Sequence, residues 1–478
     1  MKLVEIVFDL PLDRTFDYLA GRWAGQLQPG CRVRVPFGPR SAIGWVVGEK
    51  EVEKAVYRYR TISRLYDRQS LLTSELLELC RYLAWRYCAS LGQVLATITA
   101  GFSLTYPAGK KSSPERKDNQ PSPENNLFST TAVPAGETTF FLYGKQHQRN
   151  QYLLSLASAS SGSCLFLFPE TRAASCFHHF LAGYFPDRTV FFHGELPGSL
   201  RLKLWHRLMT EKNLFLVGTR LGVFAPLTDL SLICLDEPEH PGYQERRQPR
   251  YETTEIASWR ARKLGAGLVL TEGCLSLSHY HAISSGQARL SVASQVLLRA
   301  RVRVIPWQRA SRRQLLTFLT EEAIACLEET VLKGQRLAIL HHRKGSFRLI
   351  SCKNCDHCFP CPDCALPMVP LEKTKSLACR FCGQNFPLPE KCPACGSKKI
   401  IWRGTGLHNI LQSLKKAYPH LEIATVTAEE KMPSNPSAQI FLGTLALEEI
   451  MEEIAPALLL IPAADAFLNL PDYRSEER

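Results

Sequence analysis

The sequence has no uninterrupted apolar run close to the length that a membrane-spanning helix needs. Its N-terminus, MKLVEIVFDLPLDR, contains Glu5 and Asp9 and has no apolar core of the kind found in secretory signal peptides. We therefore expect a cytoplasmic protein without a membrane partner. In that compartment cysteines are kept as thiols or metal ligands, so the 17 cysteines point to metal binding rather than to disulfide bonds.

The sequence also lacks the phosphate-binding loop of P-loop NTPases. That loop reads GxxxxGK[ST], because its backbone N–H groups cradle the phosphates, its Lys reaches the β- and γ-phosphates, and its Ser or Thr holds Mg²⁺. After the apolar segment FFLYG (140–144), this chain reads KQHQRNQYLL (145–154). Gly144 and Lys145 are present, but the glycine loop and the Lys–Thr pair are not. This absence excludes the usual mode of nucleotide binding.

The chain carries a large excess of positive charge. Its formal net charge is +13 and its pI is about 9.0, which favours a polyanionic partner, because Lys and Arg displace counterions from phosphates. At 478 residues the chain is long enough for two or three domains, each with its own core.

Apolar patterning divides the chain into four parts. Residues 1–104 combine period-2 strand patterns, as in GCRVRVPFG (30–38), with a helical pattern that begins at Thr73 or Ser74 as N-cap. Residues 105–136 are rich in Pro, Ser, Lys and Asn, which predicts a flexible linker. Residues 137–310 and 311–478 alternate short apolar strands with amphipathic stretches. This alternation predicts two α/β lobes, each with a parallel sheet covered by helices.

Nine cysteines lie between residues 352 and 395, inside the second lobe. Four CxxC pairs at this spacing are a strong signal for zinc, since each pair supplies two thiolates of a tetrahedral site. The fourteen residues between the second and third pairs favour a nested arrangement. The first predicted site contains Cys352, Cys355, Cys392 and Cys395, and the second contains Cys361, Cys364, Cys379 and Cys382. A cross-braced pairing of the four CxxC motifs stays open.

The ninth cysteine, Cys358, is left outside both sets. Pro360 removes a backbone N–H that a knuckle formed by Cys358 and Cys361 would use, and a knuckle formed by Cys355 and Cys358 would strand Cys352. With four sulfur ligands at each ion, no position remains for a water molecule, so both predicted zinc ions are structural. The insertion 352–398 should therefore be unfolded without metal.

The motifs around this cluster resemble a known family over nearly the whole chain and in the same order. They are LPLDRTFDYL (10–19), GCRVRVPFG (30–38), SLGQVLA (90–96), LVGTRLGVFAPL (216–227), LICLDEPEHPGYQE (232–245), PRYETTEIA (249–257), HHRKGSF (341–347), the eight-cysteine insertion, WRGTG (402–406) and NLPDYRSEER (469–478). The chain resembles the bacterial replication-restart protein PriA, a superfamily 2 helicase. The resemblance implies an N-terminal β-rich domain that binds DNA 3′ ends, followed by two RecA-like lobes.

The resemblance places a 3′-end pocket at Phe16, Asp17, Gly38 and Arg60. An aromatic ring can stack on a terminal base, a carboxylate can accept a hydrogen bond from a 3′-hydroxyl, and a cation suits phosphate. The plain alternative is that Phe16 and Asp17 only shape a turn of the sheet. Further arginines would make the surrounding surface basic: Arg14, Arg32, Arg34 and Arg40.

In the first lobe, the resemblance implies DNA contacts by Arg220 of the GTR segment and by an aromatic-rich loop. The members of this loop are Tyr243 and Tyr251, with Arg246, Arg247 and Arg250. Rings and guanidinium groups that alternate in a polar loop suit contact with a single strand.

The same resemblance shows that the ATP machinery is altered. Asp236 and Glu237 follow an apolar strand, as a degenerate Mg²⁺-binding and water-activating pair, but the motif reads DEPE where the family has DEEH. TEGCLS (271–276) replaces the coupling motif, and the chain ends at Arg478, where an arginine-bearing helix would begin. We therefore expect no catalytic residues, no efficient ATP binding, and a solvated acidic pair at Asp236 and Glu237.

These observations predict a replication-restart protein that binds forked DNA or a free 3′ end and supports assembly of the primosome and of the replicative helicase, without helicase activity of its own. The expected cofactors are two Zn²⁺ ions per chain, and the expected partners are DNA, primosome and helicase-loading proteins and single-stranded DNA-binding protein. One alternative is an active ATP-dependent helicase with a non-standard nucleotide loop. A second is a zinc-stabilised interaction scaffold that does not bind DNA.

Overall fold

The computed structural model describes the chain in two compact units, residues 1–299 and 300–478. The described residues are 2–53, 58–104, 133–134, 136–293, 301–306, 316, 318–341, 349–355, 357–366, 368–371, 376–379, 382–403, 407–427, 435, 437–462 and 464. Nearly all of the predicted linker and the segment 469–478 lie outside these residues. Among the described helices, none is long and apolar enough to cross a membrane.

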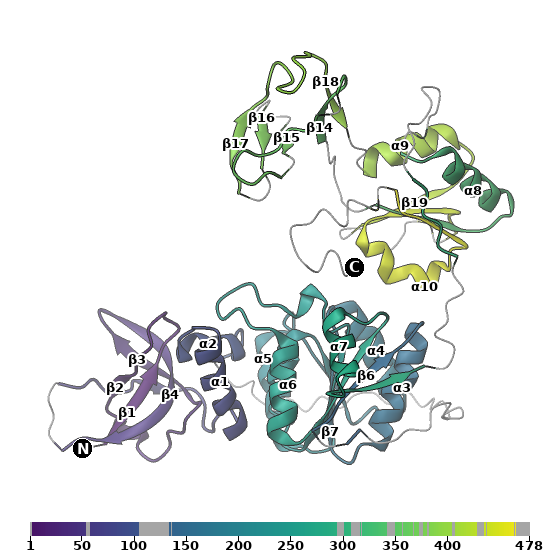
Figure 1. The fold of residues 1–478 in the computed structure, drawn as a ribbon. Helices are drawn as coiled ribbons and strands as arrows, with labels where there is room; N and C mark the ends of the chain where they lie inside the picture. Colours follow the sequence, from purple (N-terminus) through teal and green to yellow (C-terminus); the bar gives the residue numbers. More distant parts are fainter. Residues whose placement is uncertain are drawn as a thin grey trace. The chain divides into compact units, whose positions relative to one another are not determined.

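The N-terminal domain is built on an antiparallel sheet with the strand order β2-β1-β4-β3-β5 (Figure 1). Val33 and Val35 point into its core, and Arg34 between them is exposed, as the period-2 pattern predicts. Arg32 departs from that pattern. Its guanidinium is buried and forms an ion pair with buried Asp67 at 2.8 Å. It therefore does not contribute to a basic surface. The strands are β1 (Lys2–Val7), β2 (Phe16–Tyr18), β3 (Arg32–Phe37), β4 (Arg40–Glu51) and β5 (Arg64–Leu65).

Two helices complete this domain, α1 (Ser74–Arg86) and α2 (Leu91–Ile98). The hydroxyl of Thr73 accepts a hydrogen bond from the backbone N–H of Leu76 at 3.2 Å, so Thr73 is the N-cap of α1. Ser90 and Gln93 form a capping box that starts α2. Both helices begin at residues whose side chains satisfy the free N–H groups of the first turn.

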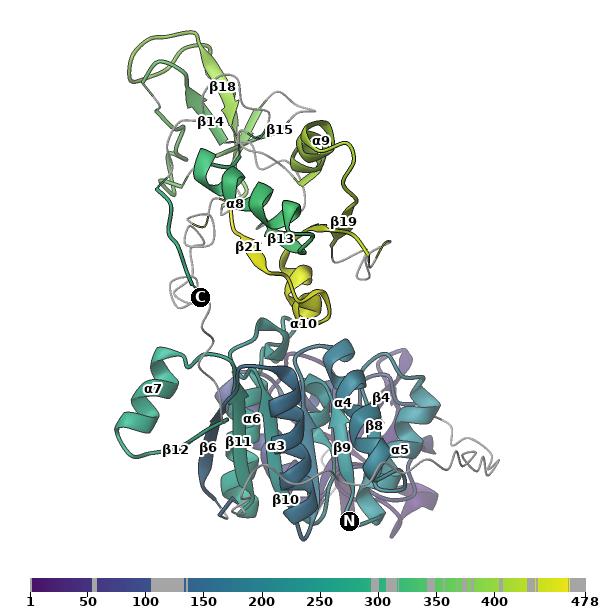
Figure 2. The same ribbon diagram turned by 90° about the vertical axis from the view of Figure 1, so that its right-hand side faces the viewer.

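The first lobe contains a seven-stranded sheet with the order β12-β6-β11-β10-β7-β9-β8, in which every neighbouring pair is parallel. One face of the sheet is covered by α3 and α4 and the other by α5 and α6, together with α1 and α2 of the N-terminal domain (Figures 1 and 2). The predicted parallel α/β architecture is confirmed. The elements are β6 (Thr138–Leu142), α3 (Gln146–Ala159), β7 (Ser163–Leu167), α4 (Thr171–Tyr184), β8 (Thr189–Phe192), α5 (Gly198–Thr210), β9 (Phe215–Gly218), η2 (Arg220–Phe224), β10 (Leu230–Asp236), η3 (Pro241–Tyr243), α6 (Thr253–Leu264), β11 (Gly267–Glu272), α7 (Leu277–Ser284) and β12 (Arg289–Val292).

One ion pair with a buried guanidinium joins the N-terminal domain to the first lobe inside this unit. The guanidinium of Arg260 on α6 is fully buried and binds the carboxylate of Glu75 on α1 with two hydrogen bonds, of 2.8 and 3.1 Å. It also donates to the carbonyl oxygens of Val223 and Ala225 at 2.7 and 3.0 Å. Because a buried guanidinium needs all of these acceptors, the two parts of the unit are held in one arrangement.

The second unit contains a parallel sheet with the order β19-β20-β13-β21 and an antiparallel insertion. The insertion begins and ends in the pair β14 and β18, and it carries a three-stranded sheet and a small core of its own. The elements are α8 (Glu321–Leu332), β13 (Leu337–Leu340), β14 (Leu349–Cys352), β15 (Val369–Leu371), β16 (Ser376–Ala378), β17 (Asn385–Pro387), β18 (Ile400–Arg403), α9 (Leu407–Ala417), β19 (Ile423–Val426), β20 (Ile440–Gly443), η4 (Leu445–Ile450), α10 (Met451–Ile454) and β21 (Leu458–Leu460).

Candidate functional sites

The structure brings together three residues of the predicted 3′-end pocket: Phe16 on β2, Gly38 in the turn between β3 and β4, and Arg60 in the segment before β5. Arg60 donates a hydrogen bond from its guanidinium to the carbonyl oxygen of Gly38 at 2.7 Å, and its own carbonyl accepts one from Leu19, which follows β2. Phe16 of β2 lies edge-on to Phe37, the neighbour of Gly38, with ring centroids 5.4 Å apart. Gly38 and Arg60 are exposed, and Phe16 and Asp17 are half-buried. Phe16, Gly38 and Arg60 therefore lie close together, whereas Asp17, the next residue of β2, points to the other face of the strand, where Glu5 and Lys50 lie.

Two further cations lie next to residues of this set, and only Arg14 stood out in the sequence. The guanidinium of Arg14 lies over the ring of Phe16, 4.7 Å from its centroid. The ammonium of Lys50 on β4 forms an ion pair with Asp17 at 2.8 Å, and this hydrogen bond raises the pKa of Lys50. Lys50 and Asp17 lie 33 positions apart, so only the pairing of β1 with both β2 and β4 brings them together. The contact of Lys50 with Asp17 could have been predicted only from the register of β1 with β2 and β4.

The strand end at Asp236 is not the solvated acidic pair that the sequence suggested. Asp236 is buried, and its carboxylate forms a short ion pair with the buried guanidinium of Arg149 on α3. It also accepts hydrogen bonds from Tyr143 at 3.1 Å and from Thr271 at 2.8 Å. Only Glu237, whose φ is +49°, is exposed. The correction has a simple physical cause, because a carboxylate can be buried when a cation and hydrogen-bond donors surround it.

Burial and the neighbouring charges shift the pKa values of Tyr143 and Arg149 in this cluster. Burial raises the pKa of Tyr143 well above its usual value, and the neighbouring Asp236 raises it further. For Arg149, burial works against the charged form, but the carboxylate of Asp236 outweighs it and raises the pKa of the guanidinium. The group is therefore a neutral pair of opposite charges in an aromatic surrounding, with Arg149 lying 5.2 Å from the ring centroid of Phe168.

The N-terminus of α3, where a phosphate-binding loop would lead into its helix, is occupied by a side chain of the helix itself. The amide oxygen of Gln148 accepts hydrogen bonds from the backbone N–H groups of Gly144 and Lys145, both at 3.0 Å. These are N–H groups that an anion would otherwise use. In this conformation these two N–H groups and the carboxylate of Asp236 have their partners within the protein.

In the first lobe, the aromatic members of the predicted DNA loop are buried. Tyr243 is 0% exposed and Tyr251 is 1% exposed, so neither ring can stack on a base in this conformation. Tyr243 directs its hydroxyl at the carbonyl oxygens of Leu167 and Asp236, each 2.8 Å away. Arg250 is exposed, while Arg220 forms an ion pair with Glu245 at 3.0 Å. The arginines of this loop are therefore better placed for a ligand than its tyrosines.

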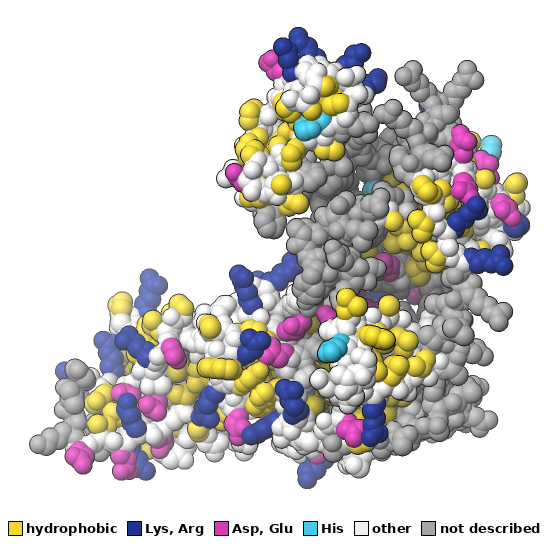
Figure 3. Space-filling view, viewed as in Figure 1, with side chains coloured by type: hydrophobic (Ala, Val, Ile, Leu, Met, Phe, Trp, Pro, Cys, Tyr) yellow, Lys and Arg dark blue, Asp and Glu magenta, His cyan; other side chains and the backbone are white. Residues whose placement is uncertain are grey.

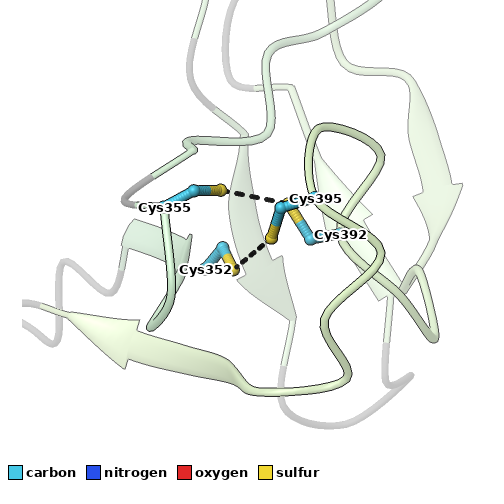
Figure 4. Close-up of side chains that lie close together, drawn as sticks. All are labelled: Cys352, Cys355, Cys392 and Cys395. Atoms are coloured by element: carbon cyan, nitrogen blue, oxygen red, sulfur yellow. Dashed lines mark hydrogen bonds between the residues drawn. The ribbon is translucent and has the colours of Figure 1, made fainter.

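The eight cysteines of the four CxxC pairs form two groups of four, with the nested pairing (Figure 4 shows the first group). In each group the four sulfur atoms lie within 4.8 Å of one another. Within the first group, the sulfur atoms of Cys352 and Cys395 are 3.5 Å apart and those of Cys355 and Cys392 are 3.6 Å apart. Neither group includes Cys358, which is exposed and pairs through a β-bridge with Ser351.

Each CxxC pair has the same backbone geometry. The N–H of the first cysteine donates to the carbonyl of the residue five positions later, at 2.7–2.9 Å: Cys352 to His357, Cys361 to Leu366, Cys379 to Gln384 and Cys392 to Ser397. Among the described residues that directly follow a second cysteine, three have positive φ: Ala365, Gly383 and Gly396. This repeated turn aims both sulfur atoms of a pair at one point.

The chemistry of the two groups fits a tetrahedral metal site. All four donors of each group are thiols, which suit Zn²⁺, and no oxygen donor is among them. The backbone N–H of Asn354 donates to the sulfur of Cys352 at 3.4 Å. Although desolvation opposes the charged form, hydrogen bonds from the backbone of Cys355 and Asn354 lower the pKa of Cys352 to about 6. The structure therefore supports two sites that could each hold a metal ion.

Comparisons with known proteins agree with this architecture. A family model described as the PriA 3′DNA-binding domain (3′BD) matches residues 5–100. The chain is 26% identical to the replication restart protein PriA of Treponema pallidum over 507 aligned residues, which cover 99% of this chain and 76% of the relative. It is 26% identical to the PriA of Bacillus subtilis, over 68% of this chain and 43% of the relative. It is 23% identical to the PriA of Borreliella burgdorferi, over 99% of this chain and 75% of the relative.

Two solved structures are similar at lower identity. The DUF1998 helicase MrfA bound to DNA has a TM-score of 0.36 and 12% identity, over 72% of this chain and 49% of that chain. RecG bound to a three-way DNA junction has a TM-score of 0.34 and 9% identity, over 72% of this chain and 43% of that chain. The chain is thus similar to the replication restart proteins PriA over nearly its whole length, and its residues 5–100 match the 3′DNA-binding domain of that family.

Proposed function

We propose that this protein takes part in replication restart by recognising branched DNA with an exposed 3′ end. The observation that carries the proposal is the closeness of Phe16, Gly38 and Arg60 within the segment that matches a 3′DNA-binding domain, with Asp17 next to Phe16 on β2. Phe16 would stack on the terminal base, Asp17 would accept the hydrogen bond of the 3′-hydroxyl, and Arg60 would contact phosphate. Lys50 would hold Asp17 in place through their ion pair.

Fork binding tests this proposal. The full chain is titrated with a fork whose leading strand ends at the junction in a 3′-hydroxyl, and with the same fork ending in a 3′-phosphate. We expect tighter binding to the hydroxyl form, and we expect Asp17→Asn to reduce this preference while leaving duplex binding unchanged. The matched control is Asp13→Asn, at an exposed carboxylate of the same domain. Equal affinity for both forks and for blunt duplex would contradict the proposal.

We further propose that the protein supports assembly of the primosome and of the replicative helicase without acting as a helicase itself. Two features of the first lobe support this: the carboxylate of Asp236 is engaged by Arg149, and the N-terminus of α3 is engaged by Gln148. Primosome proteins, helicase-loading proteins and single-stranded DNA-binding protein are the proposed partners. An active helicase that uses a non-standard nucleotide loop is the alternative.

DNA-stimulated phosphate release separates these two functions. We expect no turnover of ATP with forked DNA in excess. Turnover by the unchanged chain that is lost in the variant Asp236→Asn, with retained DNA binding, would support the helicase alternative instead. The conservative amide is preferred to alanine because it keeps the shape of the buried side chain.

The two groups of cysteines are proposed to hold two structural Zn²⁺ ions per chain. Zinc would fix the insertion 352–398, and the outer surface of the insertion would contact partner proteins. Metal analysis of the purified chain should give two zinc ions per chain, falling to one in Cys361→Ser/Cys379→Ser. Two zinc ions together with no DNA binding would favour the second alternative, a scaffold for protein interactions.

A further inference from the structure

The two cysteine groups lie at different places in the insertion. In the first group, Cys352 is the last residue of β14 and pairs with Ile400 of β18, so this group lies where the insertion begins and ends. In the second group, Cys379 directly follows β16 and Cys382 precedes β17, so this group lies in the three-stranded sheet. We call β14, β18 and the first group the base of the insertion, and β15–β17 with the second group its tip.

Asn354 joins the two halves of the first group. Its backbone N–H donates a hydrogen bond to the sulfur atom of Cys352 at 3.4 Å, and its side-chain amide donates one to that of Cys395 at 3.7 Å. These two sulfur atoms belong to different CxxC pairs and lie 3.5 Å apart (Figure 4). One residue therefore gives donors to both pairs, and such donors stabilise the negative charge of metal-bound thiolates.

The second group has Asp363 in the equivalent position. The pairs CKNC (352–355) and CPDC (361–364) share the turn in which the first cysteine donates its N–H to a carbonyl five residues later, at 2.9 and 2.7 Å. Asn354 and Asp363 are each the third residue of this turn. An ionised carboxylate has no hydrogen to donate, and its charge repels thiolates. Asp363 is exposed, and in the described part of the chain it has no ion pair.

Positive charge also gathers at the first group. The backbone N–H of Lys353 donates to the carbonyl oxygen of Lys399 at 2.8 Å, beside the pair β14 and β18. Figure 3 shows Lys and Arg side chains at the end of the insertion near β18, with few acidic ones among them. The exposed lysines next to this group are Lys353, Lys391, Lys398 and Lys399. Asp356 and Glu390 offset part of their charge, whereas the acid of the second group offsets Arg380. A Zn²⁺ ion with four thiolates carries a net negative charge, which nearby cations stabilise.

We propose that the two metal sites are unequal, and that Asn354 strengthens the first site while Asp363 weakens the second. Neither side chain is a ligand, so both act through the sulfur atoms as positioning residues. The inference rests on the proposed zinc binding and goes beyond it, because it assigns an order of metal loss. Groups that hydrogen-bond to metal ligands change metal affinity about ten- to hundredfold, so we expect the first site to bind Zn²⁺ at least about tenfold more tightly.

This order has a consequence for the fold of the insertion. Its small core includes Cys361 and Cys379 of the second group, packed with Phe359, Met368 and Leu377. When the free Zn²⁺ concentration falls, the second site should empty first, and the tip should lose its order while β14 and β18 stay paired. The insertion then has an intermediate state with a closed base and an open tip.

Equilibrium competition tests the order of metal loss. The full chain is placed in a series of chelator buffers that set the free Zn²⁺ concentration, and thiols without metal are alkylated briefly at each point. Mass spectrometry of the digested chain then reports every cysteine separately, with Cys358 as the reference outside both groups. We expect the second group to become reactive at a free Zn²⁺ concentration at least about tenfold higher than the first group.

Exchange of the two side chains tests their roles. Asn354→Ala should weaken the first site about tenfold, and Asp363→Asn should strengthen the second site, a gain that misfolding cannot produce. In Asn354→Asp/Asp363→Asn the order of loss should reverse. The control is Asn385→Asp, the same change at an exposed residue of β17 outside the CxxC pairs, which should leave the first site unchanged.

Two results would overturn the inference. They are equal or reversed reactivity of the two groups in the unchanged chain, and an order that the double variant leaves as it was. Either result, with two zinc ions in the purified chain, would keep the proposed zinc binding. A purified chain without zinc would remove both. Hydrogen exchange at intermediate Zn²⁺ concentrations gives an independent check, since protection in β16 and β17 should be lost before that in β14 and β18, and the opposite order would contradict the inference.

Discussion

Arg149 places a single positive charge beside the carboxylate of Asp236, at the strand end where a nucleotide-binding lobe would hold a divalent cation. The two side chains are both buried, and Tyr143 and Thr271 complete the hydrogen bonding of the carboxylate. A buried guanidinium in this position neutralises the carboxylate. It can support the fold of the lobe, which is a testable role.

Removing one member of this pair should be strongly destabilising. We expect Arg149→Met to lower the free energy of unfolding of unit 1 by about 3–5 kcal/mol, because it leaves a buried carboxylate without a cation. The double variant Arg149→Met/Asp236→Asn should recover much of this loss. Urea unfolding measures both changes. The control is Arg207→Met, which breaks an exposed pair with Glu211 and should cost less than about 1 kcal/mol. Equal effects at Arg149 and Arg207 would contradict the structural role.

Ala365 is a second residue whose conformation makes a prediction. It follows Cys364 with φ of +56°, in the position that Gly383 and Gly396 occupy after Cys382 and Cys395. A left-handed conformation is unfavourable for a residue with a Cβ atom and unstrained for glycine.

We expect Ala365→Gly to stabilise the metal-bound insertion by about 0.5–1 kcal/mol. This would appear as a few-fold slower loss of metal to a chelator. The opposite change, Gly396→Ala, should speed that loss, since a Cβ atom there meets no neighbour within 4 Å and only the backbone conformation is penalised. Faster loss from Ala365→Gly would show that this turn relaxes when metal binds.

At the scale of the elements, α1 and α6 meet at Glu255. Burial opposes ionisation of this carboxyl group, but the hydroxyls of Tyr87 and Tyr82 and the guanidinium of Arg86 outweigh it and lower the pKa of Glu255. A group whose pKa is lower in the folded state stabilises that state above its ordinary pKa. This contribution is lost as the pH falls through the lowered value.

We therefore expect the contact between α1 and α6 to be stable at neutral pH and to weaken below about pH 4.3, the ordinary value for glutamate. Urea midpoints of the unchanged chain and of Glu255→Gln should differ at pH 7 and converge as the pH falls below that value. The difference should be below about 1 kcal/mol, because the side chain is partly exposed. A gap that widens in acid would refute the assignment.

Local sequence patterns predicted the elements well and the long-range contacts poorly. The apolar runs predicted the parallel sheets, and the spacing of the CxxC pairs predicted the nested grouping of the eight cysteines. The burial of Arg32, Arg149 and Tyr243 could not be predicted, because their partners lie tens of residues away and a charged or hydroxyl side chain carries no sign of its partner. The exposure of Trp85 on α1 could not be predicted either, because an aromatic residue in a helix with several buried positions is expected to be buried as well.

The two lobes also share one local backbone feature, although the sequence shows no internal repeat. In each, a glycine at the end of a buried parallel strand is followed by threonine and a 3₁₀ turn: Gly218 with Thr219, and Gly443 with Thr444. A Cβ atom at Gly218 would come within 2.3 Å of the carbonyl oxygen of Phe192, and one at Gly443 within 2.6 Å of that of Val426. Glycine is required at both because the neighbouring strand approaches so closely.

At the scale of the whole molecule, the parts differ in what stabilises them. Residues 1–299 bury large hydrophobic clusters on both faces of a seven-stranded sheet, whereas the insertion has one small core, made of Ile350, Phe359, Cys361, Met368, Leu377 and Cys379. Two of these six are members of the cysteine groups. A segment of this size with so few apolar side chains does not reach stability by burial alone.

Metal removal should therefore unfold the insertion and leave the first unit intact. Treatment with a chelator should abolish hydrogen-exchange protection in residues 349–403 and leave that of residues 1–299 unchanged, because metal binding contributes on the order of 10 kcal/mol to folding of such sites. The proposed recognition of a 3′-hydroxyl fork at Phe16 and its neighbours should survive in the chelated protein. The double variant Cys352→Ser/Cys392→Ser should reproduce the effect without a chelator, and Cys358→Ser should have none, since Cys358 belongs to neither group. Protection that persists in the insertion after both metals are lost would show that the small core suffices, and loss of protection in residues 1–299 would show that the metal sites stabilise more than their own segment.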